Sequence, residues 1–510
     1  MTASPKARPP LKAAVVTFGC KVNQFESSAI IEELLKEGYT LSKPDEAGLL
    51  VVNACAVTEK AAAEARRLIR KYRRLNPALT IVATGCLAQL EPEALSGPLM
   101  ANLVVGQLNK SDLVSLVAGN EKIEGVFAKC PKPEIQSLGA PSSGRTRAFL
   151  KIQDGCSAGC AYCAVPLARG RSRSLEPDSV LSSLSAYLAK GAKEVVLTGI
   201  HLGHWGLDLS PPANLKDLIN LIGVRLKGFL GDCLLRLSSI EPLEIALVED
   251  KLAEKSWLAP HLHAPLQSGS DKVLSAMGRP YKAIEAEEIF VRLKEKVPDL
   301  NLGTDVMCGF PGETDADFQA TASLIDKLPF GRLHAFPFSP RRGTRADKLP
   351  GQIPSSEKSR RMAVLKELAQ KKAKDFLLSQ AGKKRKALVL SSDSGAGRWR
   401  ALTDNYIRAL LPQGFEAKPG QFIEIVILAP SAGSDQAEAV PAAQAEGAHS
   451  TPAAAVQIAQ AQGAQAIRVA QANRIEATQA EGDPIAQAEP NPPDEPSAFS
   501  QAFDTSRDPS

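Results

Sequence analysis

The residues with the clearest chemical potential are three cysteines inside eight positions, in the run GCSAGCAYC. Cys156, Cys160 and Cys163 could bring three thiolates to one centre, and thiolates select zinc, copper(I) or iron–sulfur clusters. A structural zinc site usually has four protein ligands, but no fourth cysteine or histidine lies close by in the sequence. Three ligands on a four-iron cluster would leave one iron open to a small molecule. The spacing therefore indicates a reactive cluster, and with it an enzyme.

A second set of three cysteines is spread over the N-terminal part of the chain. Cys20, Cys55 and Cys86 each lie at or near the end of an apolar segment: AAVVTFGC, GLLVVNACAV and LTIVATGC. The gaps of 35 and 31 residues each match about one strand–helix repeat. Because parallel strands bring their carboxyl ends to one edge of a sheet, we expect the three thiols to meet there. The pattern predicts a second metal cluster, although a single thiol at a strand end would be unremarkable in a core.

Both sets of cysteines belong to regions in which short apolar strands alternate with helical stretches. Residues 12–130 predict an α/β domain with a parallel sheet, and a Pro-, Ser- and Gly-rich linker, 131–146, follows it. Residues 147–374 predict a partial or complete α/β barrel, which forms its site at the carboxyl ends of its strands. The six predicted strands of this barrel are KIQDG, KEVVLTGI, CLLRLSSI, HLHAPLQ, LNLGTDVMCGF and RLHAFPF.

The compact cysteine run directly follows the first of these strands, at the end where a barrel forms its site. Polar and glycine-rich positions gather at the ends of the other strands. Each of them could contact a cofactor or could hydrogen-bond within the barrel core. The candidates for cofactor contact are Thr198, Ser239, Gln267 and Glu313.

The last two parts of the chain differ sharply in composition. Residues 375–430 are mostly β in pattern and predict a small barrel, a fold that often binds nucleic acid. Residues 431–510 are rich in Ala, Gln, Glu and Pro, with few branched apolar side chains. Such a segment cannot bury a core, so we expect a disordered tail and assign it no function.

The charge is unevenly distributed between the tail and the body of the chain. The net charge is +5, but the segment from Ser431 onward holds three Arg and no Lys against eleven acidic residues. The rest therefore carries about +13, which suits a polyanion such as RNA. A predicted helix between Glu59 and Asn76 is rich in arginine, although most such runs are solvated faces. The candidate RNA contacts are Arg66, Arg70 and Arg73 in this helix and Lys384, Arg398 and Arg400 in the small barrel.

The length and the cysteines of the chain also indicate its domain number and its redox environment. A chain of 510 residues suggests two to four domains. Nine clustered cysteines without a secretory segment indicate thiolate ligands in a reducing cytoplasm rather than disulfide bonds. The apolar run near the N-terminus is too short for a signal or membrane span, so we expect no membrane association.

Taken together, the motifs resemble the methylthiotransferase family of radical S-adenosylmethionine (SAM) enzymes. The similarity runs from about Val15 to Leu428. It implies an α/β domain with one cluster, a radical SAM barrel with a second, and an RNA-binding β-barrel called TRAM. The motifs that carry it are TFGCKVNQFES, VVNACAVT, ATGCLAQ, KIQDGCSAGCAYC, LTGIHLG, RLSSIEP, HLHAPLQSGSD, GTDVMCGFPGET and HAFPFSPRRGT.

The resemblance also implies roles for individual residues and partners. Cys156, Cys160 and Cys163 would hold the radical [4Fe–4S] cluster, and Tyr162 would contact the adenine of SAM. The N-terminal triad would hold an auxiliary [4Fe–4S] cluster. Two SAM molecules would supply a 5′-deoxyadenosyl radical and a methyl group, and a flavodoxin- or ferredoxin-type donor would supply electrons. The remaining cysteines, Cys130, Cys233 and Cys308, match no ligand of the family.

Within the family, the chain is most similar to the branch that modifies N6-threonylcarbamoyladenosine beside the tRNA anticodon. The residues after Cys20 and Cys55, and the sequence Ile200-His201-Leu202-Gly203, follow that branch. A departure, the small pair Ala158-Gly159 in the cluster loop, affects the packing of the loop rather than ligation. The alternatives are methylthiotransferases acting on isopentenyladenosine tRNA or on a ribosomal protein. A more distant one is a non-catalytic RNA-binding protein with structural metal sites.

Overall fold

The computed structural model describes residues 11–118, 125–127, 146–254, 256–392, 397–430 and 436–447. These residues form two compact units, the first ending at Ala373 and the second beginning at Lys374. Cys130, most of the predicted linker and most of the predicted tail lie outside the described residues. No helix in the described ranges is long and apolar enough to cross a membrane.

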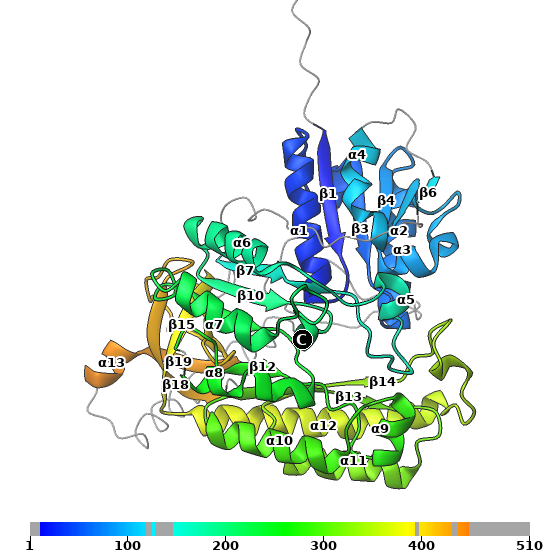
Figure 1. The fold of residues 1–510 in the computed structure, drawn as a ribbon. Coiled ribbons are helices and arrows are strands. Elements are labelled where there is room, and N and C mark those ends of the chain that lie inside the picture. Colours follow the sequence, from blue (N-terminus) through cyan, green and yellow to red (C-terminus); the bar gives the residue numbers. More distant parts are fainter. Residues whose placement is uncertain are drawn as a thin grey trace, which may run out of the picture. The chain divides into compact units, whose positions relative to one another are not determined.

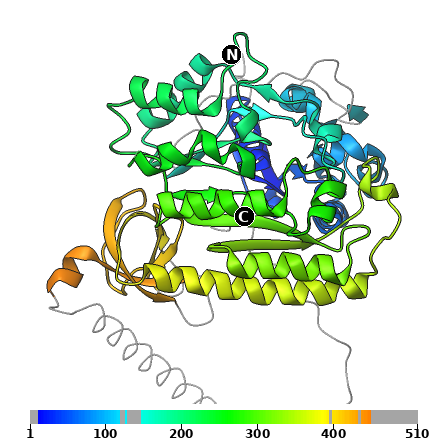
Figure 2. The ribbon, with the colours of Figure 1, turned by 60° about the horizontal axis from the view of Figure 1, so that its bottom comes forward.

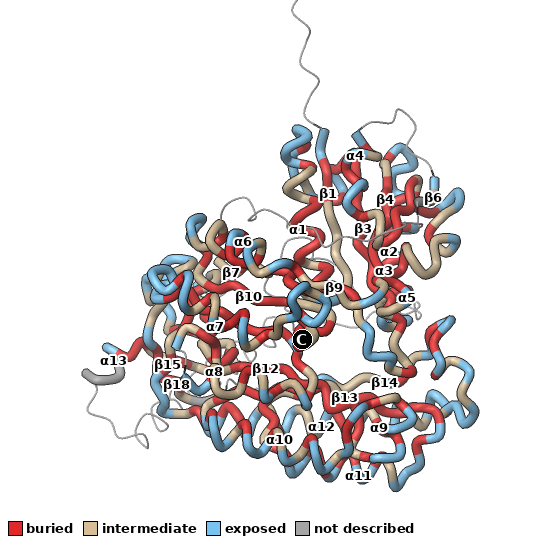
Figure 3. The backbone as a smooth tube through the Cα atoms, viewed as in Figure 1, coloured by how far each residue is buried: buried red, intermediate tan, exposed pale blue. Residues whose placement is uncertain are grey.

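The first unit begins with a six-stranded parallel sheet in the order β2-β1-β3-β4-β5-β6. All six residues of β3 are buried, as expected for a central strand with helices on both faces; Figure 3 shows this burial along the sheet. The strands are β1 Lys12–Thr17, β2 Thr40–Leu41, β3 Leu49–Ala54, β4 Thr80–Gly85, β5 Leu103–Gly106 and β6 Gly125–Phe127.

Helices cover both faces of this sheet, as Figure 1 shows. Ile30 and Leu34 of α1 and Leu113 of α4 share one apolar cluster with the strands, and Ala62 and Ile69 of α2 belong to another. The predicted parallel-sheet α/β domain is therefore confirmed. The helices are α1 Lys21–Lys36, α2 Glu59–Leu75, α3 Cys86–Leu90 and α4 Leu113–Ala118, with 3-10 turns η1 Pro44–Glu46, η2 Pro92–Leu95 and η3 Gln107–Asp112.

The same unit continues as a partial α/β barrel of six parallel strands. β7, β10 and β11 form one half and β12, β13 and β14 the other, and isolated bridges such as Ser239 to His263 join the halves. Within the described ranges no pairing joins β14 back to β7. The strands are β7 Arg147–Lys151, β10 Glu194–Thr198, β11 Leu234–Leu237, β12 His261–His263, β13 Asn301–Cys308 and β14 Arg332–Pro337.

The first predicted barrel strand, KIQDG, is displaced in the structure. The barrel strand β7 ends at Lys151, and the following Gln153–Asp154 forms a short hairpin strand, β8, with β9 Arg173–Ser174. Only Ile152 separates these two short strands, and β8 has two residues, so periodicity in the sequence does not separate them. The consequence is that the cysteine run begins after β8 rather than after a barrel strand.

Helices pack on the outside of the barrel around one large apolar cluster. Glu194, the first residue of β10, accepts hydrogen bonds at 2.8 Å from both Arg147 and the fully buried Arg236. These helices are α6 Pro177–Ala189, α7 Leu215–Arg225, α8 Glu249–Glu254, α9 Asp271–Met277, α10 Ala283–Lys296, α11 Asp315–Lys327 and α12 Ser355–Gln380, with η4 Leu202–His204, η5 Pro242–Leu247 and η6 Ala346–Lys348. Helix α5 Val165–Arg169 instead places Ala168 in an apolar cluster of the N-terminal sheet.

The second unit is a closed β-barrel in the strand order β15-β16-β17-β19-β18, coloured orange in Figure 2. A small barrel was predicted here, but its predicted boundary at residue 430 is wrong. The strands are β15 Lys384–Ser392, β16 Trp399–Thr403, β17 Arg408–Leu410, β18 Phe422–Pro430 and β19 Gln436–Pro441, followed by α13 Ala442–Gly447.

Strand β19 belongs to the segment that was predicted to be a disordered tail. It pairs with both β17 and β18 and thereby closes the barrel. Its inward residues Ala437 and Ala439 are fully buried, whereas Gln436 and Glu438 alternate with them on the other face. Because its buried side chains are so small, the strand has the composition of the Ala- and Glu-rich tail that follows it. Composition therefore concealed a strand whose alternation was present.

We predict that a chain ending at Pro430 has an unstable second unit, because it lacks the strand that pairs with β17 and β18. A chain ending at Gly447 is the matched control and should melt like the full chain. Limited proteolysis and calorimetry would compare the two. Equal melting of both truncated proteins would show that β19 is dispensable.

Candidate metal centres and cofactor site

Three adjacent strands of the N-terminal sheet bring Cys20, Cys55 and Cys86 to one edge. Cys20 caps the N-terminus of α1 after β1, Cys55 directly follows β3, and Cys86 is the first residue of α3 after β4. β1, β3 and β4 are neighbours in the sheet. The expectation that parallel strands bring these thiols together is met in this arrangement.

Gly19 allows Cys20 and Cys55 to approach each other closely. Its φ is +101°, and a Cβ there would lie 2.5 Å from Cys55 Cβ and 2.7 Å from Cys55 Sγ. Burial, together with the nearby Cys20 and Cys86, raises the pKa of Cys55 to about 12. The three thiols thus form one electrostatically coupled group. Three soft thiol donors at one edge fit a three-ligand iron–sulfur cluster.

The second triad lies in the loop between β8 and α5, and each thiol has its own hydrogen-bonding neighbour. The backbone N–H of Ala158 donates to Cys156 Sγ at 3.4 Å, and that of Val165 donates to Cys163 Sγ at 3.4 Å. The guanidinium of Arg279 donates to Cys160 Sγ at 3.5 Å. Donors to sulfur orient cluster ligands and stabilise their charge, so this loop is arranged for thiolates.

The two triads approach each other within the first unit. Burial raises the pKa of Cys163, and Cys160, Cys156 and Cys86 of the other triad contribute to its rise to about 12. The helices that follow the two triads, α3 and α5, also contact one another. Two three-thiol sets from different domains therefore share one region.

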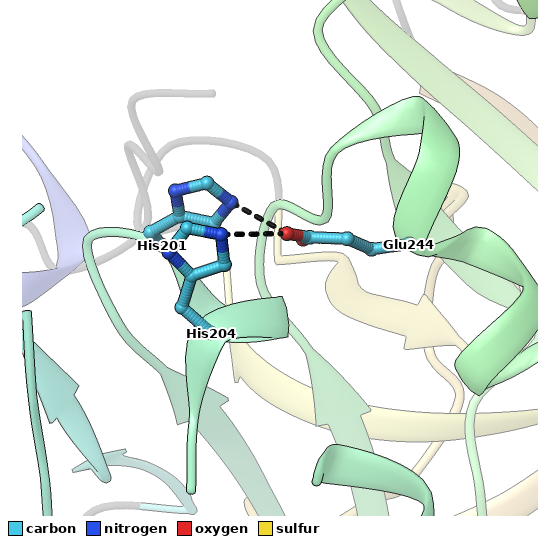
Figure 4. A group of neighbouring side chains, drawn as sticks. All are labelled: His201, His204 and Glu244. Atoms are coloured by element: carbon cyan, nitrogen blue, oxygen red, sulfur yellow. Dashed lines mark hydrogen bonds and ion pairs between the residues drawn. The ribbon is translucent and has the colours of Figure 1, made fainter. Parts of the chain in front are cut away.

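Two histidines and a glutamate form one group, which Figure 4 shows, and His201 joins this group to the compact triad. His201 Nδ1 lies 3.5 Å from Cys156 Sγ, and its Nε2 lies 2.7 Å from Glu244 Oε1. The ring of His204 stacks on that of His201, and its Nε2 lies 3.3 Å from the same oxygen. Burial lowers the pKa of His201, but the hydrogen bonds to Cys156 and Glu244 outweigh it and raise the pKa to about 9.

These three side chains have the composition of a metal site, but the distances favour hydrogen bonds. Two ligands of a tetrahedral zinc lie about 3.3 Å apart, given zinc–ligand bonds of about 2.0–2.1 Å. The 2.7 Å separation between His201 and Glu244 is that of a charge-assisted hydrogen bond. We therefore interpret the group as a support that aims His201 at Cys156.

The candidate cofactor contacts occupy different environments around the barrel mouth. Thr198 is buried at the end of β10, and Tyr162 packs against the apolar cluster around Met277 and Phe310. Gln267 has a positive φ of 68°, and its buried Oε1 has no hydrogen-bond partner among the described residues. A strained polar residue with an unsatisfied buried atom fits a site that awaits a ligand.

The other two candidates differ from expectation in detail. Ser239 is exposed, whereas its neighbour Ser238 is buried with an Oγ that lacks a partner among the described residues. Glu313 Oε2 accepts from the backbone N–H of Gly309 at 2.6 Å and pairs with Arg361. Glu313 therefore anchors the loop after β13, and only its buried Oε1 is left for a ligand.

Several polar side chains near the site were not singled out from the sequence. The carboxylate of Asp305 on β13 lies 2.9 Å from His334 Nδ1 and 3.1 Å from His263 Nε2. The two histidines come from the two flanking strands. Arg279, besides contacting Cys160, pairs with Glu241. All of these residues except Arg279 lie inside the quoted motifs of the barrel, but their partners are far apart in the sequence. Only the pairing of the strands identifies them as groups.

The arginines of helix α2 differ in exposure: some are buried in the fold and others lie on the surface. Arg73 is buried, and its guanidinium donates to the carbonyl oxygens of Met100, Pro77 and Leu79 at 3.2, 2.9 and 2.8 Å. Arg73 is therefore part of the fold and not available to RNA, contrary to expectation. Arg66 is mostly buried and pairs with Glu59 and Glu91, whereas Arg67, Arg70 and Arg74 are exposed.

The candidate RNA contacts in the small barrel also differ in exposure. Lys384 is exposed. Arg398 pairs with Glu438 of β19 and donates to the carbonyl of Leu411 at 2.8 Å, so it helps to close the barrel. Arg400 is partly buried on β16.

Comparison with known proteins decides the family. Two family models match: Uncharacterized protein family UPF0004 over residues 12–106 and the Radical SAM superfamily over residues 150–325. Threonylcarbamoyladenosine tRNA methylthiotransferase MtaB of Thermotoga maritima is 39% identical, over 74% of this chain and 86% of the relative. The chain belongs to the radical SAM methylthiotransferase family. The expected family and fold class are thereby confirmed.

Other relatives are of two kinds. MtaB of Bacillus subtilis is 32% identical, over 81% of this chain and 92% of the relative. A protein named tRNA-2-methylthio-N(6)-dimethylallyladenosine synthase, from Hahella chejuensis, is 31% identical over 84% of this chain and 98% of the relative. Among solved structures, the radical SAM methyltransferase TsrM of Kitasatospora setae matches with a TM-score of 0.47 and 16% identity, covering 66% of this chain and 77% of that one.

We predict that Gly19→Ala prevents cluster assembly on the N-terminal triad, because the added Cβ would displace Cys55. Anaerobic reconstitution should then load about half of the iron of the unaltered protein if each triad holds one cluster. Gly38→Ala is the matched control, since Gly38 also has a positive φ but nothing within 4 Å of its Cβ position. Full iron loading of a folded Gly19→Ala protein would contradict the proposed crowding.

We predict opposite consequences for two arginines of α2. Arg73→Leu leaves three carbonyl oxygens without this donor, two of them in buried contacts, and should lower the free energy of unfolding by about 3 kcal/mol. Arg70→Leu should change it by less than about 0.5 kcal/mol, because Arg70 is exposed. Urea unfolding measures both variants. Equal stability of the two variants would overturn the distinction.

Proposed function

We propose that the protein adds a methylthio group to carbon 2 of N6-threonylcarbamoyladenosine, immediately 3′ of the tRNA anticodon. The observation that carries this proposal is the meeting of two three-cysteine donor sets in one region of the first unit. The names of several relatives, among them those from Thermotoga maritima and Bacillus subtilis, support the substrate.

Two [4Fe–4S] clusters fit the two triads, and their chemistry with SAM is activation of an inert C–H bond followed by methylthio transfer. The chain's own residues orient these groups. His201, Arg279 and two backbone N–H groups support the thiolates of the compact triad. Ser238 and Gln267 offer unsatisfied polar atoms to SAM, with Thr198 and Tyr162 beside them. A low-potential flavodoxin- or ferredoxin-type protein would supply the electrons.

Binding of tRNA would use the exposed cations of both units. Arg67, Arg70 and Arg74 lie on the surface of α2, and Lys384 is exposed on the small barrel, which would act as the RNA-binding TRAM domain. The target base must leave the anticodon stack, which costs a few kcal/mol. Phosphate contacts can offset that cost and would make binding strongly salt-dependent.

The runner-up substrate is dimethylallyladenosine tRNA, because one kind of relative is named for it. The residues after Cys20 and the Ile200–Gly203 segment favour the threonylcarbamoyl branch by resemblance. In this structure His201 of that segment contacts Cys156, so the residue that marks the branch lies at the radical triad.

The experiment that tests the proposal compares three tRNA substrates with the reconstituted full chain. Anticodon stem–loops carrying threonylcarbamoyladenosine, dimethylallyladenosine or plain adenosine are incubated with SAM and dithionite, and nucleosides are identified by mass spectrometry. We expect methylthio product on the first only. Product on the dimethylallyl substrate alone would assign the runner-up, and product on neither would refute tRNA methylthiolation.

A further inference from the structure

Five charged side chains are buried together where the N-terminal sheet domain contacts the radical SAM barrel within the first unit. Two come from α1 and η3 of the sheet domain, and three come from β7, β8 and α5 of the barrel. Nothing in the proposed chemistry uses them. They are Glu26, Lys110, Lys151, Asp154 and Arg169, with exposed fractions of 4, 9, 6, 5 and 1%.

Glu26 is the centre of this group, which we call the Glu26 network. Its carboxylate accepts from Arg169 at 2.8 Å, from Lys151 at 3.1 Å and from Lys110 at 2.6 Å. Burial would raise the pKa of Glu26, but the three cations outweigh burial and hold it well below its usual range. The second carboxylate, Asp154, lies 3.0 Å from Arg169 and 2.9 Å from Lys151. Glu26 is therefore ionised, and Asp154 is paired with two cations.

The three cations are charged as well. Lys110 Nζ lies within hydrogen-bond distance of three oxygens: Glu26 Oε2, Asn53 Oδ1 at 3.0 Å and Gln107 Oε1 at 2.7 Å. Only an ammonium group has the three N–H bonds that this arrangement uses. Arginine remains protonated in proteins, and the carboxylates outweigh burial to raise the pKa of Lys151. Three cations against two anions leave one positive charge unbalanced.

The surplus charge lies beside the auxiliary triad. Arg169 ends α5, which packs against α3, and α3 begins with Cys86. Ala168, which precedes Arg169 in α5, shares a buried apolar cluster with Cys86. Arg173, whose guanidinium lies 3.9 Å from Asp154, adds positive charge and does not balance the network.

A cluster on Cys20, Cys55 and Cys86 would supply the missing negative charge. Three thiolates outweigh the two positive charges of an oxidised four-iron core, so the assembly is anionic by one charge and by two after reduction. We propose that the unbalanced positive charge of the Glu26 network stabilises the reduced auxiliary cluster and thereby sets its reduction potential, while the network joins the two cluster-bearing domains. This inference rests on the proposed function, because it requires a cluster on the N-terminal triad.

The network makes a prediction that a purely structural role does not make. Removing a positive charge should make the cluster harder to reduce, and removing a negative charge should make it easier to reduce. Two substitutions of similar size at the same contact, Arg169→Gln and Glu26→Gln, remove charges of opposite sign. Loss of packing alone would affect both variants in the same direction. Arg169→Lys keeps the charge and should restore the potential although it loses the forked hydrogen bonds.

The experiment uses the full chain with Cys156, Cys160 and Cys163 changed to Ala, so that only the auxiliary cluster is present. The cluster is titrated with dithionite under anaerobic conditions, and its reduced form is measured by electron paramagnetic resonance. At a fixed potential we expect the reduced-to-oxidised ratio to fall about tenfold for Arg169→Gln and to rise about tenfold for Glu26→Gln, about 59 mV each for a one-electron couple. Arg292→Gln, a half-exposed surface cation, is the control and should leave the ratio unchanged.

The outcomes separate this inference from the proposed function. A loaded cluster whose potential moves in the same direction in both variants, or in neither, would overturn the electrostatic role and leave the proposed function standing. A chain without the radical triad that binds no iron would overturn the auxiliary cluster and both proposals. If Arg169→Gln does not fold, Lys151→Gln removes the same charge from the network, and its ratio must also fall.

Discussion

The contact between Glu26 and Arg169 is the constraint on which the arrangement of the first unit depends. Both side chains are almost fully buried, and they come from different domains. A buried charge without its partner costs several kcal/mol, so neither domain can move away without exposing or stranding a charge. The pair therefore fixes the geometry of the contact between the two domains rather than adding net stability. It joins α5 of the barrel to α1 of the sheet domain, and α5 also contacts α3 of that domain.

This contact has a direct chemical consequence, because α3 and α5 each follow a cysteine triad in the sequence. Cys86 is the first residue of α3, and Val165 begins α5 two residues after Cys163. Fixing the two helices together therefore fixes the two thiol sets relative to each other. Around this shared region the polar residues are divided by role: His201 and Arg279 face the thiols, and Ser238 and Gln267 keep unsatisfied atoms.

The strand periodicity and the cysteine spacing were enough to predict both α/β regions and both triads, since each signal is local. Roles that depend on partners far apart in the sequence could not be predicted. Arg73 looks like its exposed neighbours until the carbonyls of residues 77, 79 and 100 are placed around it. Strand β19 was missed because its buried side chains are alanines, which resemble the tail in composition. Arg279 lies outside the quoted motifs, and only the fold brings it to Cys160.

We propose that Cys20, Cys55 and Cys86 hold one four-iron cluster and that Cys156, Cys160 and Cys163 hold another. Iron analysis and Mössbauer spectroscopy on the anaerobically reconstituted chain would test this. We expect about eight irons per chain, and about four after either triad is replaced by alanine. Complete loss of iron on removing one triad, or no change on removing it, would contradict two separate centres.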